Sequence, residues 1–255
     1  MKGLRDKTVL IAGGTGGVGT ATALRLGAEG ANVVVGSRHE ESAAQVADAI
    51  TTAGGRALAL RLDIVDEASV VSAVHTATEW SGRLDAVHVN AANMTPDVIM
   101  NDSDVAAIDL EVFDATVQVN LRGAVLCARH AVPALLATGG GALVYTSSAA
   151  AFVGEPERPA YAMTKTGLHA LVRHVASRWG REGIRANAVA PGPVPSEAVL
   201  PYLDEAMLDG MRAALHSPRL GRPDDVAALV AFLVSDDGEW INGQVINVDD
   251  GMVLR

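Results

Sequence analysis

The sequence is poor in cysteine and in basic charge, and both shortages narrow the possible functions. Cys127 is the single cysteine among 255 residues, so no intramolecular disulfide can form, which suits a reducing compartment such as the cytoplasm. The 20 Lys and Arg residues are outnumbered by 30 Asp and Glu residues, which gives a net charge of −10. Because nucleic acids and anionic membrane surfaces attract basic proteins, we expect neither as a partner.

Long hydrophobic runs are missing as well. The longest uncharged stretch, residues 131–154, is interrupted by Pro133, three consecutive glycines and two serines, so it cannot form a membrane-spanning helix. The N-terminal residues 1–7 lead directly into an apolar strand, without the apolar region of a secretory signal. We therefore expect a cytoplasmic protein with no membrane segment.

Short apolar runs alternate with helix-length stretches along the chain. Strands are predicted at 9–12, 33–35, 57–62, 86–89, 142–145, 186–190 and 245–248, and helices at 17–29, 40–53, 66–80, 110–137, 160–181 and 223–234. Most of the strands are near-continuous apolar runs, which is typical of parallel strands buried on both faces. The alternation predicts an α/β fold of Rossmann type: a doubly wound, mainly parallel seven-stranded sheet with helices on both faces. Since no linker interrupts it, we expect one domain over residues 1–255.

A glycine-rich turn follows the first predicted strand. Five of the 26 glycines lie in the segment Gly13-Gly14-Thr15-Gly16-Gly17-Val18-Gly19. Glycines let backbone N–H groups reach a pyrophosphate at a helix N-terminus, where partial positive charge favours anions. The turn lies in the first βα unit, where a dinucleotide-binding protein needs it, so we interpret it as a cofactor loop. A flexible turn without a ligand is the alternative.

The end of the second predicted strand bears on the choice of cofactor. An NAD-binding protein usually has an acidic residue about 20 residues after the glycines, which binds the ribose 2′-hydroxyl. This sequence has Ser37, Arg38 and His39 there, and its first acid is Glu40. A hydroxyl and a guanidinium suit a 2′-phosphate, so NADP(H) is favoured over NAD(H). The alternative is an ordinary solvated surface arginine.

Three side chains further along form a candidate catalytic group. Tyr161 and Lys165 are spaced i,i+4 and so lie on one face of a predicted helix. A phenol with a pKa of about 10 is a poor base at neutral pH, but a nearby cation favours the phenolate. Ser148 follows the strand at 142–145, at the strand end where doubly wound sheets bind ligands, and its hydroxyl can donate to a carbonyl oxygen. A Tyr–Lys pair alone is also common by chance on surface helices.

In this combination the sequence resembles the short-chain dehydrogenase/reductase superfamily, in its short single-domain branch with a layout like that of ketoacyl reductases. The resemblance covers essentially the whole chain. It rests on motifs that follow one another in the family's order: Gly13/Gly17/Gly19, Leu62-Asp63, Asn90-Ala91-Ala92-Asn93, Asn120, Ser148, Tyr161/Lys165, Pro191-Gly192 and Val248-Asp249-Asp250-Gly251.

The resemblance implies roles for the candidate catalytic residues. Tyr161 would be the general acid in carbonyl reduction and the base in alcohol oxidation, and Ser148 would polarise the substrate carbonyl. Lys165 would hold the nicotinamide ribose and lower the pKa of Tyr161. Asn120 would anchor a water that relays protons to Lys165.

The resemblance also implies a nicotinamide cofactor and no metal. The cofactor-binding residues would be Gly13, Thr15, Gly16, Gly17, Val18, Gly19, Ser37, Arg38, His39, Leu62, Asp63, Ile64, Asn90, Ala91, Ala92, Tyr161, Lys165, Pro191, Gly192, Val194 and Ser196. Asp63 would accept from the adenine amino group, the Val194 backbone would face the carboxamide, and Ser196 would offer a hydroxyl. Many members are tetramers paired through the helices that carry Asn120 and Tyr161, so a homo-oligomer (tetramer or dimer) is expected.

Four residues depart from the family pattern. Ala12 replaces a threonine whose hydroxyl ties the first strand to the fourth, and Ala91 replaces an asparagine. Asn93 stands where glycine is usual, and asparagine is expected to tolerate a positive φ there. Asp250 replaces a glycine in the last turn, with no assigned role. These departures question the stability around the cofactor more than the chemistry.

Other polar residues receive simpler interpretations. The seven histidines show no metal-binding spacing, and His88, in an apolar strand, is interpreted as a hydrogen-bonded core residue. Cys127 is expected to be a small buried hydrophobe. The acidic residues between Asp97 and Glu111 are interpreted as a solvated loop that leads into a helix.

Residues 193–218 are a possible substrate lid. Five apolar side chains there approximate one helical stripe: Leu200, Leu203, Met207, Leu208 and Met211. Ordinary packing against the domain is an equal alternative to closure over the nicotinamide. As a lid, the stripe predicts a largely apolar substrate, with Glu155 and Arg158 near the mouth as one polar contact.

The sequence therefore predicts an NADP(H)-dependent oxidoreductase that transfers a hydride between the nicotinamide and a small-molecule carbonyl or secondary alcohol. A non-catalytic nicotinamide-binding redox sensor is one alternative, disfavoured because Asn120, Ser148, Tyr161 and Lys165 are all present. An epimerase/dehydratase-type relative is the other, disfavoured because such proteins usually add a C-terminal substrate domain after the last strand.

Overall fold

The computed structural model describes residues 1–195 and 200–254, the side chains of residues 96, 97, 99 and 202 excepted. At its centre is a seven-stranded sheet with the order β3-β2-β1-β4-β5-β6-β7. The strands are β1 (Thr8–Ala12), β2 (Asn32–Ser37), β3 (Arg56–Arg61), β4 (Ala86–Val89), β5 (Gly141–Thr146), β6 (Ile184–Pro191) and β7 (Val245–Val248). Every neighbouring pair is parallel, so the predicted doubly wound sheet is confirmed.

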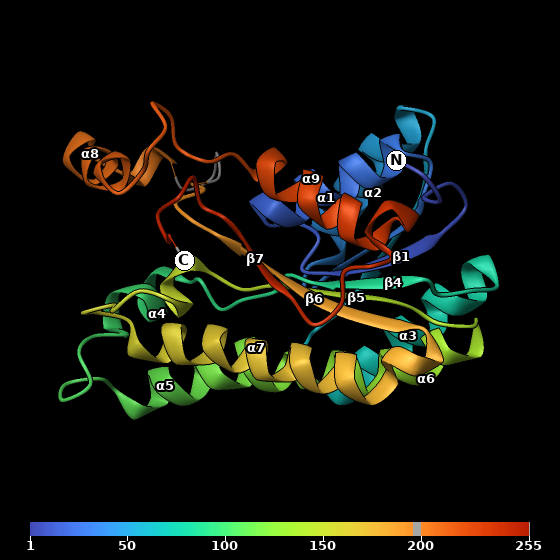
Figure 1. Cartoon of the computed structure of the whole chain (residues 1–255), viewed down its shortest axis with the longest axis horizontal. Helices are drawn as coiled ribbons and strands as arrows, with labels where there is room; N and C mark the ends of the chain where they lie inside the picture. Colours follow the sequence, from blue (N-terminus) through green and yellow to red (C-terminus); the bar gives the residue numbers. More distant parts are fainter. Residues whose placement is uncertain (196–199, 255) are drawn as a thin grey trace.

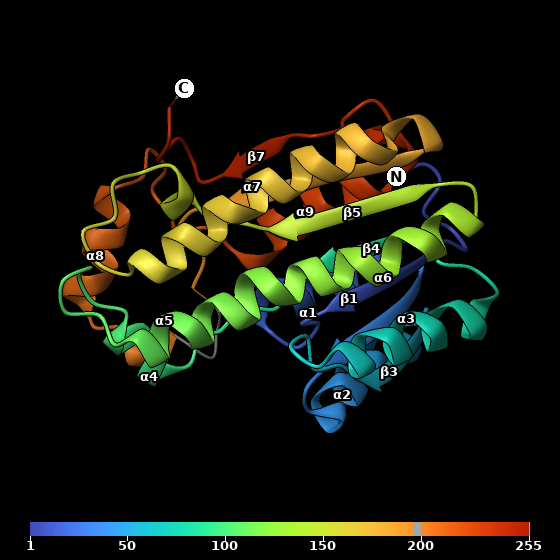
Figure 2. The same ribbon diagram turned by 90° about the horizontal axis from the view of Figure 1, so that it is seen from below.

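Helices cover both faces of the sheet (Figure 1). One face carries α1 (Gly17–Ala28), α2 (Glu40–Thr52) and α9 (Pro223–Val234), and the other carries α3 (Glu67–Ser81), α6 (Gly123–Ala137) and α7 (Pro159–Trp179). Three shorter helices are α4 (Pro96–Asn101), α5 (Leu110–Val117) and α8 (Glu205–Ala213). Figures 1 and 2 show α4 and α8 together at the end of the molecule toward which the β5 arrow points. This end, where parallel strands finish, is the one where such sheets bind ligands.

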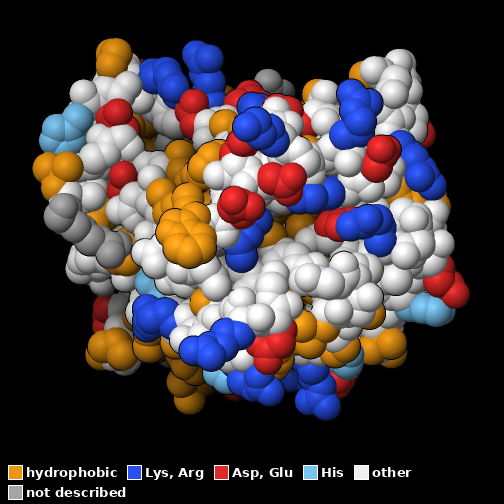
Figure 3. All heavy atoms as spheres, turned by 45° about the vertical axis from the view of Figure 1, so that its right-hand side comes forward, with side chains coloured by type: hydrophobic (Ala, Val, Ile, Leu, Met, Phe, Trp, Pro, Cys, Tyr) orange, Lys and Arg blue, Asp and Glu red, His pale blue; other side chains and the backbone are white. Residues whose placement is uncertain are grey.

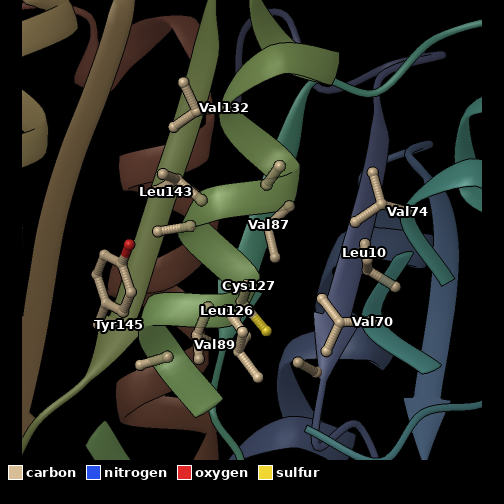
Figure 4. Close-up of a cluster of buried hydrophobic side chains, with 14 of the residues drawn as sticks. Leu10, Val70, Val74, Val87, Val89, Leu126, Cys127, Val132, Leu143 and Tyr145 are labelled. Carbon is tan, nitrogen blue, oxygen red and sulfur yellow. The ribbon is translucent and has the colours of Figure 1, made fainter. Parts of the chain in front are cut away.

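Alternation of side chains along β1 explains why its sequence is apolar throughout. Leu10 and Ala12 belong to the hydrophobic cluster on the α3/α6/α7 side, whereas Val9 and Ile11 belong to the cluster on the α1/α2/α9 side. Figure 4 shows the first of these clusters, where strand and helix side chains meet around Cys127. Burial raises the pKa of the Cys127 thiol to about 12, so it behaves as the buried hydrophobe predicted for it.

Local signals set the ends of several helices. Asp66 caps α3 by accepting from the Ala68 N–H at 3.0 Å, and Gly82, with φ +79°, ends the same helix. The single helix predicted over residues 110–137 consists of α5, a π-helical segment (Gln118–Arg122) and α6. The π-helical turn is a local irregularity of the kind often found at functional sites.

The surface carries both signs of charge. Figure 3 shows acidic and basic side chains interspersed over the face in view. In the part of the chain that the structure describes, no helix combines the length and apolarity that a membrane crossing requires. Among the same residues, no group of three or more His, Cys, Asp or Glu side chains is placed to hold a metal ion.

Candidate active site

The glycine-rich turn joins β1 to α1 and leaves its backbone accessible. The N–H groups of Gly13 and Gly14 both donate to the Gly36 carbonyl, at 3.0 and 2.9 Å, which fixes the turn against the end of β2. Gly16 is the N-cap of α1 and makes no side-chain cap bond, and the first turn of α1 contains no acid. A Cβ on Gly19 would overlap the Gly13 carbonyl oxygen. The turn thus presents helix N-terminal N–H groups, and the close packing at Gly19 admits only glycine, which fits a pyrophosphate-binding turn.

The end of β2 lies directly beside this turn. The buried Ser37 hydroxyl is 3.0 Å from the Thr15 hydroxyl and accepts from the His39 N–H at 3.3 Å. The side chains of Arg38 and His39 are exposed, and the next residue, Glu40, begins α2. Ser37 is thus held by the protein itself, and the edge also carries two exposed cations: Arg38, and Arg61, the register partner of Ser37 at the end of β3.

The end of β3 contributes the next predicted cofactor residues. Leu62 and Ile64 are buried and belong to the hydrophobic cluster, whereas Asp63 between them is half-buried. The Leu62 N–H donates to the Ser37 carbonyl at 2.8 Å, and Asp63 Oδ1 accepts from the Val65 N–H at 3.3 Å. Asp63 is therefore the member of this trio whose side chain is free to face a ligand.

Asn90 links the glycine-rich turn to the neighbouring strands. Its Nδ2 donates to the Gly13 carbonyl at 2.9 Å, and its Oδ1 accepts from the Thr146 hydroxyl at 2.9 Å. The Thr146 oxygen in turn lies 2.9 Å from Nε2 of the fully buried His88. Because the Thr146 proton is used on Asn90, His88 must donate through Nε2, which leaves its Nδ1 as a lone pair with no partner among the described residues.

The turn after β4 accommodates three of the four departures from the family pattern. The Ala12 carbonyl accepts from the N–H groups of both Asn90 and Ala91, at 2.9 and 2.8 Å, so the backbone ties β1 to β4 without a threonine hydroxyl. Ala91 packs against Gly13: a Cβ added to Gly13 would lie 2.6 Å from the Ala91 nitrogen. Ala92 is half-buried. A positive φ at Asn93 is not observed; its N–H instead donates to Asn120 Oδ1 at 2.7 Å.

The fourth departure, Asp250, has the conformation that a glycine would favour. Its φ is +53°, in the left-handed region, and its side chain is exposed. The family's glycine at this position is thus explained by the backbone, whereas its counterpart at Asn93 is not.

The Ser148, Tyr161 and Lys165 side chains converge at the end of β5. The Ser148 hydroxyl lies close enough to the phenol to lower the pKa of Tyr161. Ser148 also begins a short 3-10 turn, where its oxygen accepts from the Ala150 N–H at 3.2 Å. The buried Lys165 ammonium lies 5.5 Å from the centre of the Tyr161 ring and donates to the Thr146 carbonyl at 2.7 Å. Thr146 therefore connects Lys165 with the chain of hydrogen bonds that leads to Gly13.

The pKa of Tyr161 is shifted upward, whereas the family resemblance implied that Lys165 lowers it. Burial raises the pKa of Tyr161, the Ser148 hydrogen bond and the Arg158 charge lower it, and Glu155 raises it. The expected lowering by Lys165 is not seen in the described structure: the net shift is upward, and the cation that acts on the phenol is Arg158. Burial lowers the pKa of Lys165 itself to about 8, and its proton is directed to the Thr146 carbonyl.

Asn120 lies in the π-helical segment between α5 and α6. Its Oδ1 accepts from the Asn93 N–H at 2.7 Å, and its Nδ2 lies 3.3 Å from the Thr164 hydroxyl, next to Lys165. The side chain is buried and joins the turn after β4 to α7. The amide has a second Nδ2 proton and a second Oδ1 lone pair beyond these two bonds.

The residues expected at the nicotinamide end follow β6. Pro191 ends the strand, and the Gly192 N–H donates to the Val248 carbonyl at 3.1 Å. Val194 is half-buried and packs against Gly221. Ser196 lies outside the described residues, as do the other residues of 196–199.

The stripe of the possible lid is not buried in the described structure. Leu200 and Met207 are exposed, and Leu203, Leu208 and Met211 are half-buried. Helix α8 has no buried residue and lies at the end of the molecule that holds the site (Figure 1). An apolar face that is not used for core packing is what a closing segment requires.

The interpretation of the acidic run as a solvated loop is wrong for Asp102. Asp104 is exposed and Asp109 caps α5, but the Asp102 side chain is 3% exposed and binds backbone N–H groups of α7. The partners are nearly 60 positions apart, so no local pattern reveals the contact. The one available signal is that α7 begins at Arg158-Pro159, without a Ser, Thr, Asp or Asn to cap it.

Comparisons with known proteins agree with this geometry. The family model described as enoyl-(acyl carrier protein) reductase matches residues 12–253. A probable short-chain type dehydrogenase/reductase from Bradyrhizobium diazoefficiens is 40% identical over 98% of this chain and 88% of its own length. The cis-4-hydroxycyclohexanecarboxylate dehydrogenase of Sinomonas cyclohexanicum is 35% identical over 96% of each chain.

A solved structure is equally similar. A short-chain type dehydrogenase/reductase from Mycobacterium ulcerans superimposes with a TM-score of 0.92 at 30% identity, over 98% of this chain and 91% of the other. The fold, the site and the sequence matches lead to one conclusion. The chain belongs to the short-chain dehydrogenase/reductase family, whose members are oxidoreductases that act on alcohol or carbonyl substrates with a nicotinamide cofactor.

Proposed function

We propose that the protein is an NADP(H)-dependent oxidoreductase in which Tyr161 is the acid/base for a carbonyl or secondary-alcohol substrate. The observation that carries this proposal is the convergence of three side chains: the Ser148 hydroxyl lies close enough to the phenol to lower the pKa of Tyr161, and the buried Lys165 ammonium lies 5.5 Å from the centre of the phenol ring. Two hydroxyls that converge on one point can both donate to a single carbonyl oxygen. A protein that only bound the cofactor would have no need of this arrangement, which argues against the redox-sensor alternative.

The protein's part in the reaction is to position and to protonate. The cofactor, when bound, supplies or accepts the hydride. In the direction of reduction, the Tyr161 hydroxyl gives its proton to the substrate oxygen while the Ser148 hydroxyl donates a hydrogen bond to the same atom. The Arg158 guanidinium, 5.7 Å from the centre of the Tyr161 ring, places a positive charge beside the phenolate that remains. The raised pKa of Tyr161 keeps the phenol protonated at neutral pH, as a general acid requires.

The proposed preference for NADP(H) depends on Arg38. The edge of β2 offers its exposed guanidinium beside the Ser37 hydroxyl, without a carboxylate among residues 37–39. A 2′-phosphate would gain a charge-assisted hydrogen bond there, and an acid at this position would repel it.

We propose a substrate that is largely apolar with one polar end. The stripe near α8, in which Leu200 and Met207 are exposed, supplies apolar surface, and the Arg158–Glu155 ion pair at 3.1 Å supplies a polar contact next to Tyr161. The relative from Sinomonas cyclohexanicum is named for an alicyclic alcohol of this kind, a hydroxycyclohexanecarboxylate. Cyclic ketones and secondary alcohols, with and without a carboxylate, are therefore the substrates to test first.

We also propose a cytoplasmic homo-oligomer. The single cysteine suits a reducing compartment. Helix α5, which precedes the Asn120 segment, and α7, which carries Tyr161, leave large apolar side chains uncovered, with Leu110 70% exposed and Met163 50% exposed. An exposed apolar face of this kind is typical of an association surface, and size-exclusion chromatography with light scattering tests it.

The experiment is to follow nicotinamide absorbance across this substrate panel for the wild type, Tyr161→Phe and Tyr145→Phe. Tyr145 is a matched control because its fully buried hydroxyl has no partner among the described residues. We expect Tyr161→Phe to lower kcat by about 10²-fold or more, the typical contribution of a general acid, and Tyr145→Phe to retain it. Turnover that survives Tyr161→Phe refutes the mechanism, and tight NADPH binding without turnover supports the sensor alternative.

A further inference from the structure

Tyr161 lies in the first turn of α7, where the backbone N–H groups have no hydrogen-bond partner within the helix. Tyr161 is the third residue of α7, after Pro159 and Ala160. The first N–H groups of a helix have no partner within it, and a side chain at the N-cap usually accepts from the second or third. The N-cap here is Arg158, whose side chain contains no acceptor and makes no cap bond. The sequence therefore leaves the N–H of the candidate acid/base residue uncapped by its own helix.

Asp102 supplies the missing cap from a distant part of the chain. Its Oδ1 accepts from the Ala160 N–H at 3.0 Å, and its Oδ2 accepts from the Tyr161 N–H at 2.9 Å. Its backbone carbonyl accepts from the Arg158 N–H at 2.8 Å. With 3% exposure, the carboxylate is enclosed by these contacts rather than solvated. One residue thus binds three N–H groups at the start of α7.

The same contacts hold Arg158 in an unusual conformation. Its φ is +58°, a region that residues other than glycine, asparagine and aspartate rarely adopt, and such strain persists only where the surroundings enforce it. In this conformation the Arg158 guanidinium lies 5.7 Å from the centre of the Tyr161 ring and pairs with Glu155. Asp102 thereby fixes both the backbone of Tyr161 and the cation beside its ring.

Asp102 also connects this helix to the neighbouring wall of the site. It directly follows α4, and together with Asn93, Met94 and Arg158 it borders a small cavity against Tyr161. Displacement of this wall would therefore be transmitted to the start of α7 through the carboxylate.

We propose that Asp102 is a positioning residue, which caps α7 in place of an N-cap side chain and so holds the Tyr161 hydroxyl in line with Ser148. The inference rests on the proposed function, in which Tyr161 is the acid/base. It predicts that loss of the carboxylate lowers the rate of the chemical step without weakening cofactor binding.

The test compares Asp102→Ala, Asp102→Asn and the control Asp104→Asn. Alanine removes both acceptors, whereas asparagine keeps the shape and one acceptor oxygen. Asp104 is an exposed acid of the same segment, whose Oδ1 accepts only from the Ala106 N–H at 2.9 Å among the described residues. Kinetics are measured well below the Tm of every variant, together with the Kd for NADPH. Hydrogen–deuterium exchange of the peptide that spans the start of α7 is measured in parallel.

We expect kcat to fall about 10- to 100-fold in Asp102→Ala, as for a misplaced catalytic group. The fall should be smaller in Asp102→Asn and absent in Asp104→Asn. The KM and the Kd for NADPH should stay within about twofold, since binding does not use this contact. The start of α7 should exchange faster in the same order.

Two results would overturn the proposal. One is an unchanged kcat with a lowered Tm, which would make Asp102 a residue of stability only; the other is unchanged exchange at the start of α7. A wild type without turnover on any substrate would refute the proposed function instead, and the exchange experiment would still decide whether Asp102 caps α7.

Discussion

Thr146→Val is the substitution that most directly tests how the cofactor loop is held. Valine has nearly the shape of threonine but no hydroxyl, so the change removes the hydrogen bonds of Thr146 to His88 and to Asn90. It leaves the Nε2–H of the fully buried His88 and the Oδ1 of the half-buried Asn90 without these partners. An unsatisfied buried polar group costs about 1–3 kcal/mol. Since Asn90 is only half-buried, we expect a total loss of about 2–4 kcal/mol in the free energy of unfolding.

A second substitution separates the loss of a contact from the isolation of a polar group. His88→Leu alone removes one hydrogen bond, about 1 kcal/mol, because Thr146 can still donate to Asn90. In the double variant His88→Leu/Thr146→Val, no imidazole N–H remains to be left unpaired. Replacing both partners of a buried hydrogen bond by apolar groups is often nearly neutral. The double variant should therefore be more stable than Thr146→Val by about 1–2 kcal/mol.

The assay is urea unfolding with linear extrapolation, combined with the Kd for NADPH. Because Asn90 Nδ2 holds the Gly13 carbonyl, Thr146→Val should also weaken NADPH binding about five- to tenfold. Thr138→Val is the control, since its hydroxyl donates to the Leu84 and Leu135 carbonyls, whose residues take no part in the proposed site. The reasoning is refuted if Thr146→Val unfolds within about 0.5 kcal/mol of the wild type, or if the double variant is no more stable than Thr146→Val.

Three further predictions follow from single contacts. Gly19→Ala should weaken NADPH binding by about tenfold or more, because the added Cβ would overlap the Gly13 carbonyl and lie 2.9 Å from Asn90 Nδ2. The control Gly210→Ala, with open space around the glycine, should bind NADPH as the wild type does. Equal affinities of the two variants would contradict the prediction. Arg38→Ala should weaken NADPH binding by about 10- to 100-fold, because it removes a charge-assisted hydrogen bond, and should leave the affinity for NADH unchanged. An equal effect on both cofactors would show that Arg38 does not bind the 2′-phosphate. Burial lowers the pKa of folded His88 to about 3, below about 6.5 in the unfolded chain, so its stabilising contribution is complete above pH 6.5 and is lost as the pH falls toward 3, at up to about 1.4 kcal/mol per pH unit. Urea unfolding at pH 7 and at pH 5 measures this loss. The wild type should lose more unfolding free energy between the two pH values than His88→Leu, and equal losses would contradict the prediction.

The sheet could be predicted from the sequence because its inner strands, such as β1 and β4, are buried on both faces and are therefore largely apolar. The predicted strand at 86–89 coincides with β4, and the one at 245–248 coincides with β7. The prediction was short at β6, which begins at Ile184 rather than at residue 186. The cause is Arg185, a charged residue inside the strand whose guanidinium donates to the carbonyls of Leu233 and Ser235. Local composition gives no indication of these distant acceptors.

Part of the candidate site could be predicted from neighbouring residues in the sequence, and part depends on contacts between distant segments. The glycine-rich turn and the Tyr161–Lys165 pair are local, because a helix start and an i,i+4 spacing fix their geometry. The hydrogen bonds of Asp102 with α7, and of Thr146 with His88 and Asn90, join segments many residues apart. Each residue has an ordinary alternative as an exposed acid or a β-branched strand residue, so only the folded structure distinguishes the roles.

The surroundings of Tyr161 and Lys165 also influence the protonation states of these two side chains. Tyr161 is reached from one side by the Asp102 cap, and Lys165 is held from the other by the Thr146 carbonyl. Burial raises the pKa of the phenol and lowers that of the ammonium, so both shifts make the charged pair less favourable than it would be in water. The resting site at neutral pH thus holds a protonated tyrosine, which can donate to a carbonyl oxygen without first acquiring a proton. In the proposed mechanism, oxidation of an alcohol would instead begin with removal of that proton, so we predict that the rate of oxidation rises with pH above neutrality while the rate of reduction does not.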